Sequence, residues 1–153
     1  MNILFSALGM GSMIYVVSLG FLYFMQEKMV FFPEAHISSN PRNLSLDYEE
    51  VNFYTSSKRR LSGWYVPHER ASHTLLFFYG NAGNMSHRLD RIKFFYEQGL
   101  NVFIFDYSGY GKSEGVPSEK NTYEDTLAAW SYLTKVKKIR SEQMILYGNS
   151  LGG

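Results

Sequence analysis

Three uninterrupted apolar runs, separated by segments with helical periodicity, constrain the fold of this chain more than any other feature. The runs lie within predicted strands at residues 74–79, 101–106 and 143–147. Continuous apolar character of this length is typical of strands that are covered on both faces. Strands that alternate with helices form a parallel sheet with helices packed on its faces, so the sequence predicts an α/β fold.

Two helices and a hairpin complete the predicted pattern. The first helix begins at Ser86 and ends at Gly99, which is placed as a C-cap. The second begins at residue 121 or 122, where Thr122 and Asp125 have the spacing of a capping box. Its predicted apolar face consists of Tyr123, Leu127, Trp130 and Leu133. Residues 46–55 and 60–66 are predicted to form an antiparallel hairpin before the first buried strand.

The first 26 residues carry no charged side chain. Their core, residues 3–24, contains eleven Leu, Ile, Val or Phe residues and is long enough to cross a hydrocarbon layer of about 30 Å as a helix. We predict a retained single-pass anchor at residues 1–25, a juxtamembrane connector at 26–43 and a folded body at 44–153. A cleaved signal peptide and a buried helix remain alternatives, although no Lys or Arg precedes the run. Lys28 and Arg42 follow it, which favours a cytoplasmic body.

The last apolar run leads directly into a G-x-S-x-G motif at residues 148–152. In this pattern a serine occupies a sharp strand-to-helix turn whose strained backbone tolerates only small neighbours. The turn exposes the hydroxyl group, and the amides that open the next helix face the position of a developing oxyanion. The motif therefore predicts that Ser150 is a nucleophile and that the Leu151 amide is one oxyanion-hole donor.

A glycine-rich loop at residues 80–84 follows the first buried strand. This is the place from which an oxyanion hole in this architecture takes its second amide donor, and the glycines let the backbone approach a ligand closely. A plain strand-to-helix turn is the alternative interpretation. The other glycine cluster, at 109–111, matches neither phosphate-binding pattern, because Asp106 and Glu114 occupy positions where those patterns need glycine.

Composition excludes several classes of function. The formal net charge is +1 and no basic stripe is present, so there is no electrostatic reason to expect nucleic-acid binding. The chain contains no cysteine, which excludes disulfides and thiolate metal ligands. Its four histidines lack the spacing of a zinc site. We therefore expect no metal and no cofactor.

Together these features resemble the α/β-hydrolase superfamily, and in particular its membrane-anchored, serine-aminopeptidase-like and lysophospholipase-like branch. Four segments carry the resemblance: the anchor leading into residues 26–33, the loop at 78–84, the segment 105–115 and the elbow at 148–152. The resemblance implies that Ser150 is the nucleophile, that Asn81 and Leu151 supply the oxyanion amides, and that Asp106 is structural. The family commonly has histidine where this chain has Tyr79 and arginine where it has Ser108.

The resemblance also implies a larger sheet. The family has eight strands, and its catalytic acid and histidine follow the nucleophile in chain order, whereas no histidine lies beyond His87 in these 153 residues. The expected fold is thus an α/β-hydrolase fold that stops after its fifth strand, with a bare hydrophobic edge. We expect this chain by itself to be inactive and poorly stable.

The function expected of the complete enzyme is hydrolysis of an ester, thioester or amide through an acyl-serine intermediate. Its substrate is expected to be a small-molecule or lipid-like acyl compound, because of the predicted membrane anchor. The alternative is a naturally short, non-catalytic membrane protein that uses half a hydrolase fold for interaction. The sequence that follows Gly153 in the intact gene product distinguishes the two.

Overall fold

A computed structural model describes residues 2–153, which form two compact units, residues 2–30 and 31–153. The first unit is a single helix, α1 (Asn2–Val30), so the helix continues beyond the predicted apolar core into residues assigned to the connector. Its stretch Phe5–Val30 is long and apolar enough to cross a membrane by length and composition, a test that signal sequences also pass.

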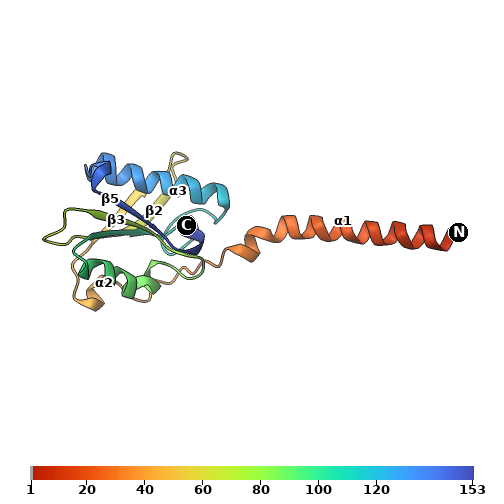
Figure 1. Ribbon diagram of the computed structural model, residues 1–153, viewed down its shortest axis with the longest axis horizontal. Helices are drawn as coiled ribbons and strands as arrows, with labels where there is room; N and C mark the ends of the chain where they lie inside the picture. Colours follow the sequence, from red (N-terminus) through yellow and green to blue (C-terminus); the bar gives the residue numbers. More distant parts are fainter. Residues whose placement is uncertain (1) are drawn as a thin grey trace. The chain divides into compact units, whose positions relative to one another are not determined.

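The second unit is an α/β body built on one five-stranded mixed sheet (Figure 1). The strand order is β1-β2-β4-β3-β5, in which β1, β2 and β4 pair antiparallel and β4, β3 and β5 pair parallel. The strands are β1 (Glu49–Tyr54), β2 (Arg60–Val66), β3 (Thr74–Phe78), β4 (Asn101–Phe105) and β5 (Met144–Gly148). The predicted hairpin and the predicted parallel strands are therefore confirmed.

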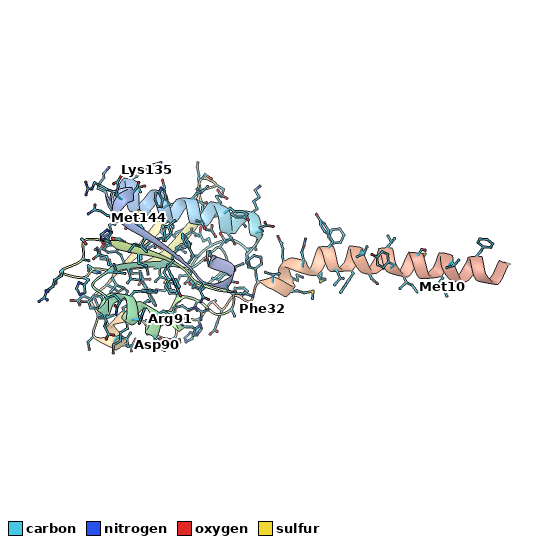
Figure 2. All side chains as sticks on the ribbon, in the orientation of Figure 1. Met10, Phe32, Asp90, Arg91, Lys135 and Met144 are labelled. Atoms are coloured by element: carbon cyan, nitrogen blue, oxygen red, sulfur yellow. The ribbon has the colours of Figure 1, made fainter. Side chains whose placement is uncertain are left out.

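Helices cover both faces of this sheet. In Figure 1, α2 (Leu89–Glu97) lies on one face and α3 (Glu119–Ser131) on the other. Figure 2 shows Asp90 and Arg91 on the α2 side and Lys135 on the α3 side, beyond the end of that helix. Helices that join parallel strands of one sheet pack on its faces in this way.

Shorter turns join these elements and adjust their ends. The 3₁₀ turns are η1 (Pro41–Leu44), η2 (Met85–Arg88), η4 (Ser141–Gln143) and η5 (Ser150–Gly152), and a wider π turn, η3 (Tyr132–Val136), continues α3. The predicted first helix thus begins as the turn η2, which Asn84 caps by accepting from the Ser86 amide at 2.9 Å. Gly99 follows α2 with a φ of +78°, as its predicted C-cap position requires.

The core is the set of side chains between the sheet and its helices. All five residues of β3 are buried, whereas β1 buries only Val51 and Phe53 on one face. Rings from β1, β4 and η3 form an aromatic cluster in which Phe53 and Phe103 both stack on Tyr132. Gly63 is needed in β2 because a Cβ there would lie 2.8 Å from the Ile104 carbonyl oxygen.

Two predictions about the second helix are wrong. The helix begins at Glu119, since the Ser118 hydroxyl caps it by accepting from the Asn121 amide at 3.1 Å. Thr122 and Asp125 consequently lie inside the helix and form no capping box, and the Asp125 side chain is fully buried. The predicted apolar face is only partly buried: Leu133 lies in the core together with Ala128 and Ala129, but Tyr123 and Leu127 are exposed.

The segment that follows α1 also behaves differently from a free connector. Phe31 is buried in the core of the second unit, and residues 32–39 form hydrogen bonds to the loop after β3 and to the turn η2. These contacts position part of the candidate site.

Candidate active site

The serine turn at the end of β5 is strained in the way that a nucleophile elbow requires. Ser150 has a φ of +54°, a left-handed conformation that costs a residue with a side chain roughly 1–2 kcal/mol. The Asn149 amide donates to the Phe78 carbonyl at 3.0 Å, which ties the turn to the end of β3. The short turn η5 begins at Ser150 itself. Strain held by neighbouring structure in this manner is characteristic of functional sites.

Close packing explains both glycines of the motif. A Cβ on Gly152 would collide with the Phe78 carbonyl group, lying 2.5 Å from its carbon atom, and a Cβ on Gly148 would lie 2.7 Å from the Gly153 Cα. Real Cβ atoms do not approach other heavy atoms so closely. Glycine is therefore required at residue 152 for the turn to pack against β3, and at residue 148 for the chain to fold back on itself.

The loop after β3 lies directly against the serine. A Cβ on Gly80 would lie 3.0 Å from the Asn149 Oδ1 atom and 3.2 Å from the Ser150 Cβ atom. Gly80 thus lets the backbone that leads to Asn81 approach the candidate nucleophile closely. The structure brings Ser150 and the predicted oxyanion loop together from segments about seventy residues apart in the chain. The third predicted residue, Leu151, is half-buried in η5 and packs against the core.

Hydrogen bonds fix the conformation of this loop. The Asn81 Oδ1 atom accepts from the Ala82 amide at 2.8 Å, the Phe32 amide at 3.0 Å and the Tyr110 hydroxyl at 3.1 Å. Arg88 donates to the Ala82 carbonyl at 2.6 Å. Both Ala82 and the glycine after it have positive φ, so the loop needs such support to keep its shape.

A cleft of about 430 Å³ opens beside Ser150. Its walls are the end of β3, the loop after it, the elbow and the start of α2, including Asp90 and Arg91, which Figure 2 labels. The lining residues are Phe77, Tyr79, Gly80, Asn81, His87, Arg88, Asp90, Arg91, Asn149 and Ser150. A small substrate group fits a cleft of this size.

A buried carboxyl group supports the cleft from behind. The Asp106 Oδ1 atom accepts from the Tyr79 hydroxyl at 2.8 Å and from the Met85 amide at 2.7 Å. Burial raises the pKa of Asp106 to about 6, even though these hydrogen bonds favour the charged form. Burial, together with the negative potential of Asp106, raises the pKa of Tyr79 well above its usual value. Asp106 therefore joins the oxyanion loop to the loop after β4.

A second cluster of polar side chains surrounds Ser108, where the resemblance implies arginine. Ser108 donates from its amide to Asp125 Oδ2 at 2.7 Å and from its hydroxyl to Oδ1 at 2.8 Å. Arg59 donates to the Ser108 hydroxyl at 3.0 Å and pairs with Asp125 at 3.4 Å and with Glu124 at 2.7 Å. Arg59, in the turn between β1 and β2, thus places a guanidinium group beside the Ser108 side chain. Burial raises the pKa of Asp125, and hydrogen bonds from Ser56, Ser57 and Arg59 lower that of Glu124 to about 2.

Sequence reasoning missed the contributions of Phe32, Tyr110 and Arg59 to these clusters. Phe32 acts through its main-chain amide, which no side-chain pattern reveals.

Among residues 2–153, no group of three or more His, Asp or Glu side chains is arranged to hold a metal ion.

The mixed sheet, with a strained serine turn at the end of the parallel strand β5, is typical of the class of α/β hydrolases. No protein-family model matches the chain, but individual proteins do. Bem46 from Schizosaccharomyces pombe is 36% identical over 95% of this chain and 52% of its own length. The α/β hydrolase domain-containing protein WAV2 from Arabidopsis thaliana is 34% identical over 95% of the chain and 49% of its own length. An uncharacterized membrane protein, YNL320W, from Saccharomyces cerevisiae is 34% identical over 90% of the chain and 50% of its own length.

Solved structures agree with these relatives. The Pyrococcus furiosus esterase Pf2001 superposes with a TM-score of 0.69 at 25% identity, over 79% of this chain and 49% of the esterase. An α/β hydrolase from Vibrio vulnificus superposes with a TM-score of 0.63 at 28% identity, over 69% of this chain and 36% of that one. The chain belongs to the α/β-hydrolase superfamily, and it spans about half the length of the curated relatives that it matches.

Proposed function

We propose that the intact protein is a serine hydrolase that cleaves an ester, thioester or amide through an acyl-Ser150 intermediate. The observation that carries this proposal is the left-handed backbone of Ser150 at the end of β5, with the glycine-rich loop after β3 packed against it. A strained serine facing a backbone loop of this kind is the arrangement that acyl transfer needs.

In the proposed mechanism, the Ser150 Oγ atom attacks the carbonyl carbon of the substrate while a base takes its proton. The carbonyl oxygen gains negative charge, which the amides of Leu151 and Asn81 stabilise by donating hydrogen bonds. The tetrahedral intermediate collapses, and the leaving group departs with the proton. Water then attacks the acyl-serine with the help of the same base and releases the acid.

The base and its acidic partner belong, in this proposal, to a further part of the intact protein. Three observations support it. No histidine follows Ser150 in the 153 residues, and the matched relatives are about twice as long. The last strand, β5, also exposes Ile145 and Leu146, by 39% and 58%, as expected of a strand that additional chain covers. The 153 residues alone are then expected to be inactive.

The proposed substrate is a small-molecule or lipid-like acyl compound at a membrane surface. A single residue, Phe31, separates the end of α1 from Phe32, whose amide bonds to the Asn81 side chain. If α1 is a retained single-pass anchor, lipid acyl groups in the membrane are the substrates that the site meets at the highest local concentration. Lys28 in the last turn of α1 and Arg42 beyond it favour a cytoplasmic position for the body.

Hydrolysis of p-nitrophenyl butyrate by the purified intact protein tests this function. Ser150→Ala removes the nucleophile and retains the small side chain that the turn accepts, so its kcat should fall by about 10⁴-fold or more. Equal activity of Ser150→Ala and the wild type, with both folded, would refute the serine mechanism.

The second candidate, a short non-catalytic interaction protein, predicts a different outcome. In that case the protein from its native membrane has a mass of 17.7 kDa, the mass of this chain, and no esterase activity. A larger mass, with activity that depends on Ser150, favours the hydrolase.

A further inference from the structure

Residues 31–34, which follow α1, bind the oxyanion loop through their main chain. The Phe32 amide donates to Asn81 Oδ1 at 3.0 Å, and the Phe32 carbonyl accepts from the Gly83 amide at 3.0 Å. The Glu34 amide then donates to the Gly83 carbonyl at 3.1 Å. These bonds form a short parallel bridge between Pro33 and Gly83. We call residues 31–34 the loop-binding segment.

The loop-binding segment is itself held on both sides. The Phe31 side chain is buried in the core. The Glu34 carbonyl accepts from the Gly111 amide at 3.0 Å and from the Asn84 side chain at 3.0 Å. The same Asn84 side chain donates to the His36 carbonyl at 2.7 Å. The segment is therefore a fixed support and not a free tether.

The part of the loop that it binds has an unfavourable backbone conformation. Ala82 and Gly83 have φ values of +67° and +76°, and a left-handed alanine alone costs about 1–2 kcal/mol. Such a conformation persists only where surrounding contacts determine it. The bonds from Phe32 and Glu34 clamp the loop on both sides of Ala82, at Asn81 and at Gly83.

We propose that the loop-binding segment is a positioning element of the oxyanion hole. Its main-chain bonds hold residues 81–83 so that the Asn81 amide points at the oxygen of the substrate carbonyl. Loss of these bonds lowers the stabilisation of the transition state more than it weakens substrate binding. This inference rests on the proposed serine hydrolase function. It assigns to Phe32 a positioning role that acts on the reaction through Asn81.

Phe32→Pro in the intact protein tests the proposal because proline removes the amide that the loop-binding segment donates to Asn81 Oδ1. The change is conformationally mild, since a residue that precedes proline, here Pro33, already favours extended backbone. Phe32→Ala is the matched control. It removes an exposed side chain but retains the amide. A displacement of about 1 Å in a catalytic group can cost about 100-fold in rate, so kcat of Phe32→Pro should be about 10-fold to 100-fold below that of Phe32→Ala, with KM changed less than about threefold.

Binding of phenylboronic acid supplies a readout that a purely structural role would not change. The boronate forms a tetrahedral adduct with the nucleophile and therefore reports oxyanion stabilisation directly. Its inhibition constant should rise in Phe32→Pro by the same factor by which kcat/KM falls. Equal kcat values for Phe32→Pro and Phe32→Ala, or a lower kcat with unchanged boronate affinity, would overturn the proposal.

Asn81→Ala provides a second route if Phe32→Pro folds poorly. It removes the Oδ1 acceptor and retains every main-chain donor, so its kcat and boronate affinity should fall together. In its background, Phe32→Pro should have little further effect, because both changes remove the same hydrogen bond. A full multiplicative loss in the double variant would contradict a shared role. Failure of the proposed function is seen separately, as esterase activity that survives Ser150→Ala.

Discussion

The buried carboxyl group of Asp106 predicts a measurable pH dependence of stability. Asp106 is fully buried, and burial raises its pKa from 3.8 to about 6. A shift of this size corresponds to about 3 kcal/mol of preference for the protonated form in the folded protein. Asp106→Asn retains the Oδ1 acceptor for the Tyr79 hydroxyl and the Met85 amide but carries no charge at any pH.

The sign of the effect follows from proton binding. Because the pKa is higher in the folded state, the folded protein binds more protons than the unfolded chain between pH 3.8 and about 6. The favourable contribution of protonated Asp106 is complete below pH 3.8 and is lost as the pH rises through 6. The free energy of unfolding of Asp106→Asn, relative to the wild type, should therefore increase by about 3 kcal/mol between pH 3.5 and pH 7.

Urea unfolding of the intact protein in detergent, followed by circular dichroism across this pH range, measures the difference. Asp90→Asn is the control for removal of a carboxylate, because Asp90 lies on the exposed side of α2 (Figure 2). A stability difference between Asp106→Asn and the wild type that stays constant from pH 3.5 to pH 7 would refute the reasoning.

Two further changes test the packing around the site. Gly152→Ala forces a Cβ into the Phe78 carbonyl group, so it should destabilise the protein by about 1–3 kcal/mol and lower kcat. Thermal unfolding and ester hydrolysis measure the two effects. Wild-type stability and wild-type kcat in this variant would contradict the close packing. Arg59→Met leaves the buried Asp125 carboxylate without its cation and should cost about 3 kcal/mol. Arg60→Met removes the pair with Glu114 and hydrogen bonds to Asn52 and the Lys112 carbonyl, all of them exposed to solvent, and should cost only about 1 kcal/mol. Equal losses in the two arginine variants, measured by urea unfolding, would show that Asp125 does not depend on Arg59.

Much of the fold follows from local patterns in the sequence. The apolar run of β3 and the turn before β2 specify their elements because every residue agrees with one structure, and the elbow identifies the end of β5. The start of α3 was predicted wrongly because two possible caps compete within a few residues. Ser118 caps the helix. Asp125 instead accepts a hydrogen bond from Ser108 and pairs with Arg59, two residues that lie outside the helix.

The candidate site divides in the same way. Ser150 and the loop at Asn81 are predictable because glycines at these spacings indicate turns in which the backbone leaves no room for a side chain. The support from Phe32 is not, since a main-chain amide leaves no mark on residue type. Nor does the sequence pattern predict that Tyr79 bonds to Asp106, because that contact depends on how two strand-end loops meet in space.

Mapping the site of covalent modification tests the central claim most directly. The intact protein would be treated with a fluorophosphonate, which reacts with activated serines, then digested and analysed by mass spectrometry. The account predicts a single adduct on Ser150 that is absent from Ser150→Ala and forms far faster than on the denatured protein. An active preparation that carries no adduct on Ser150, or carries its adduct on another residue, would contradict the account.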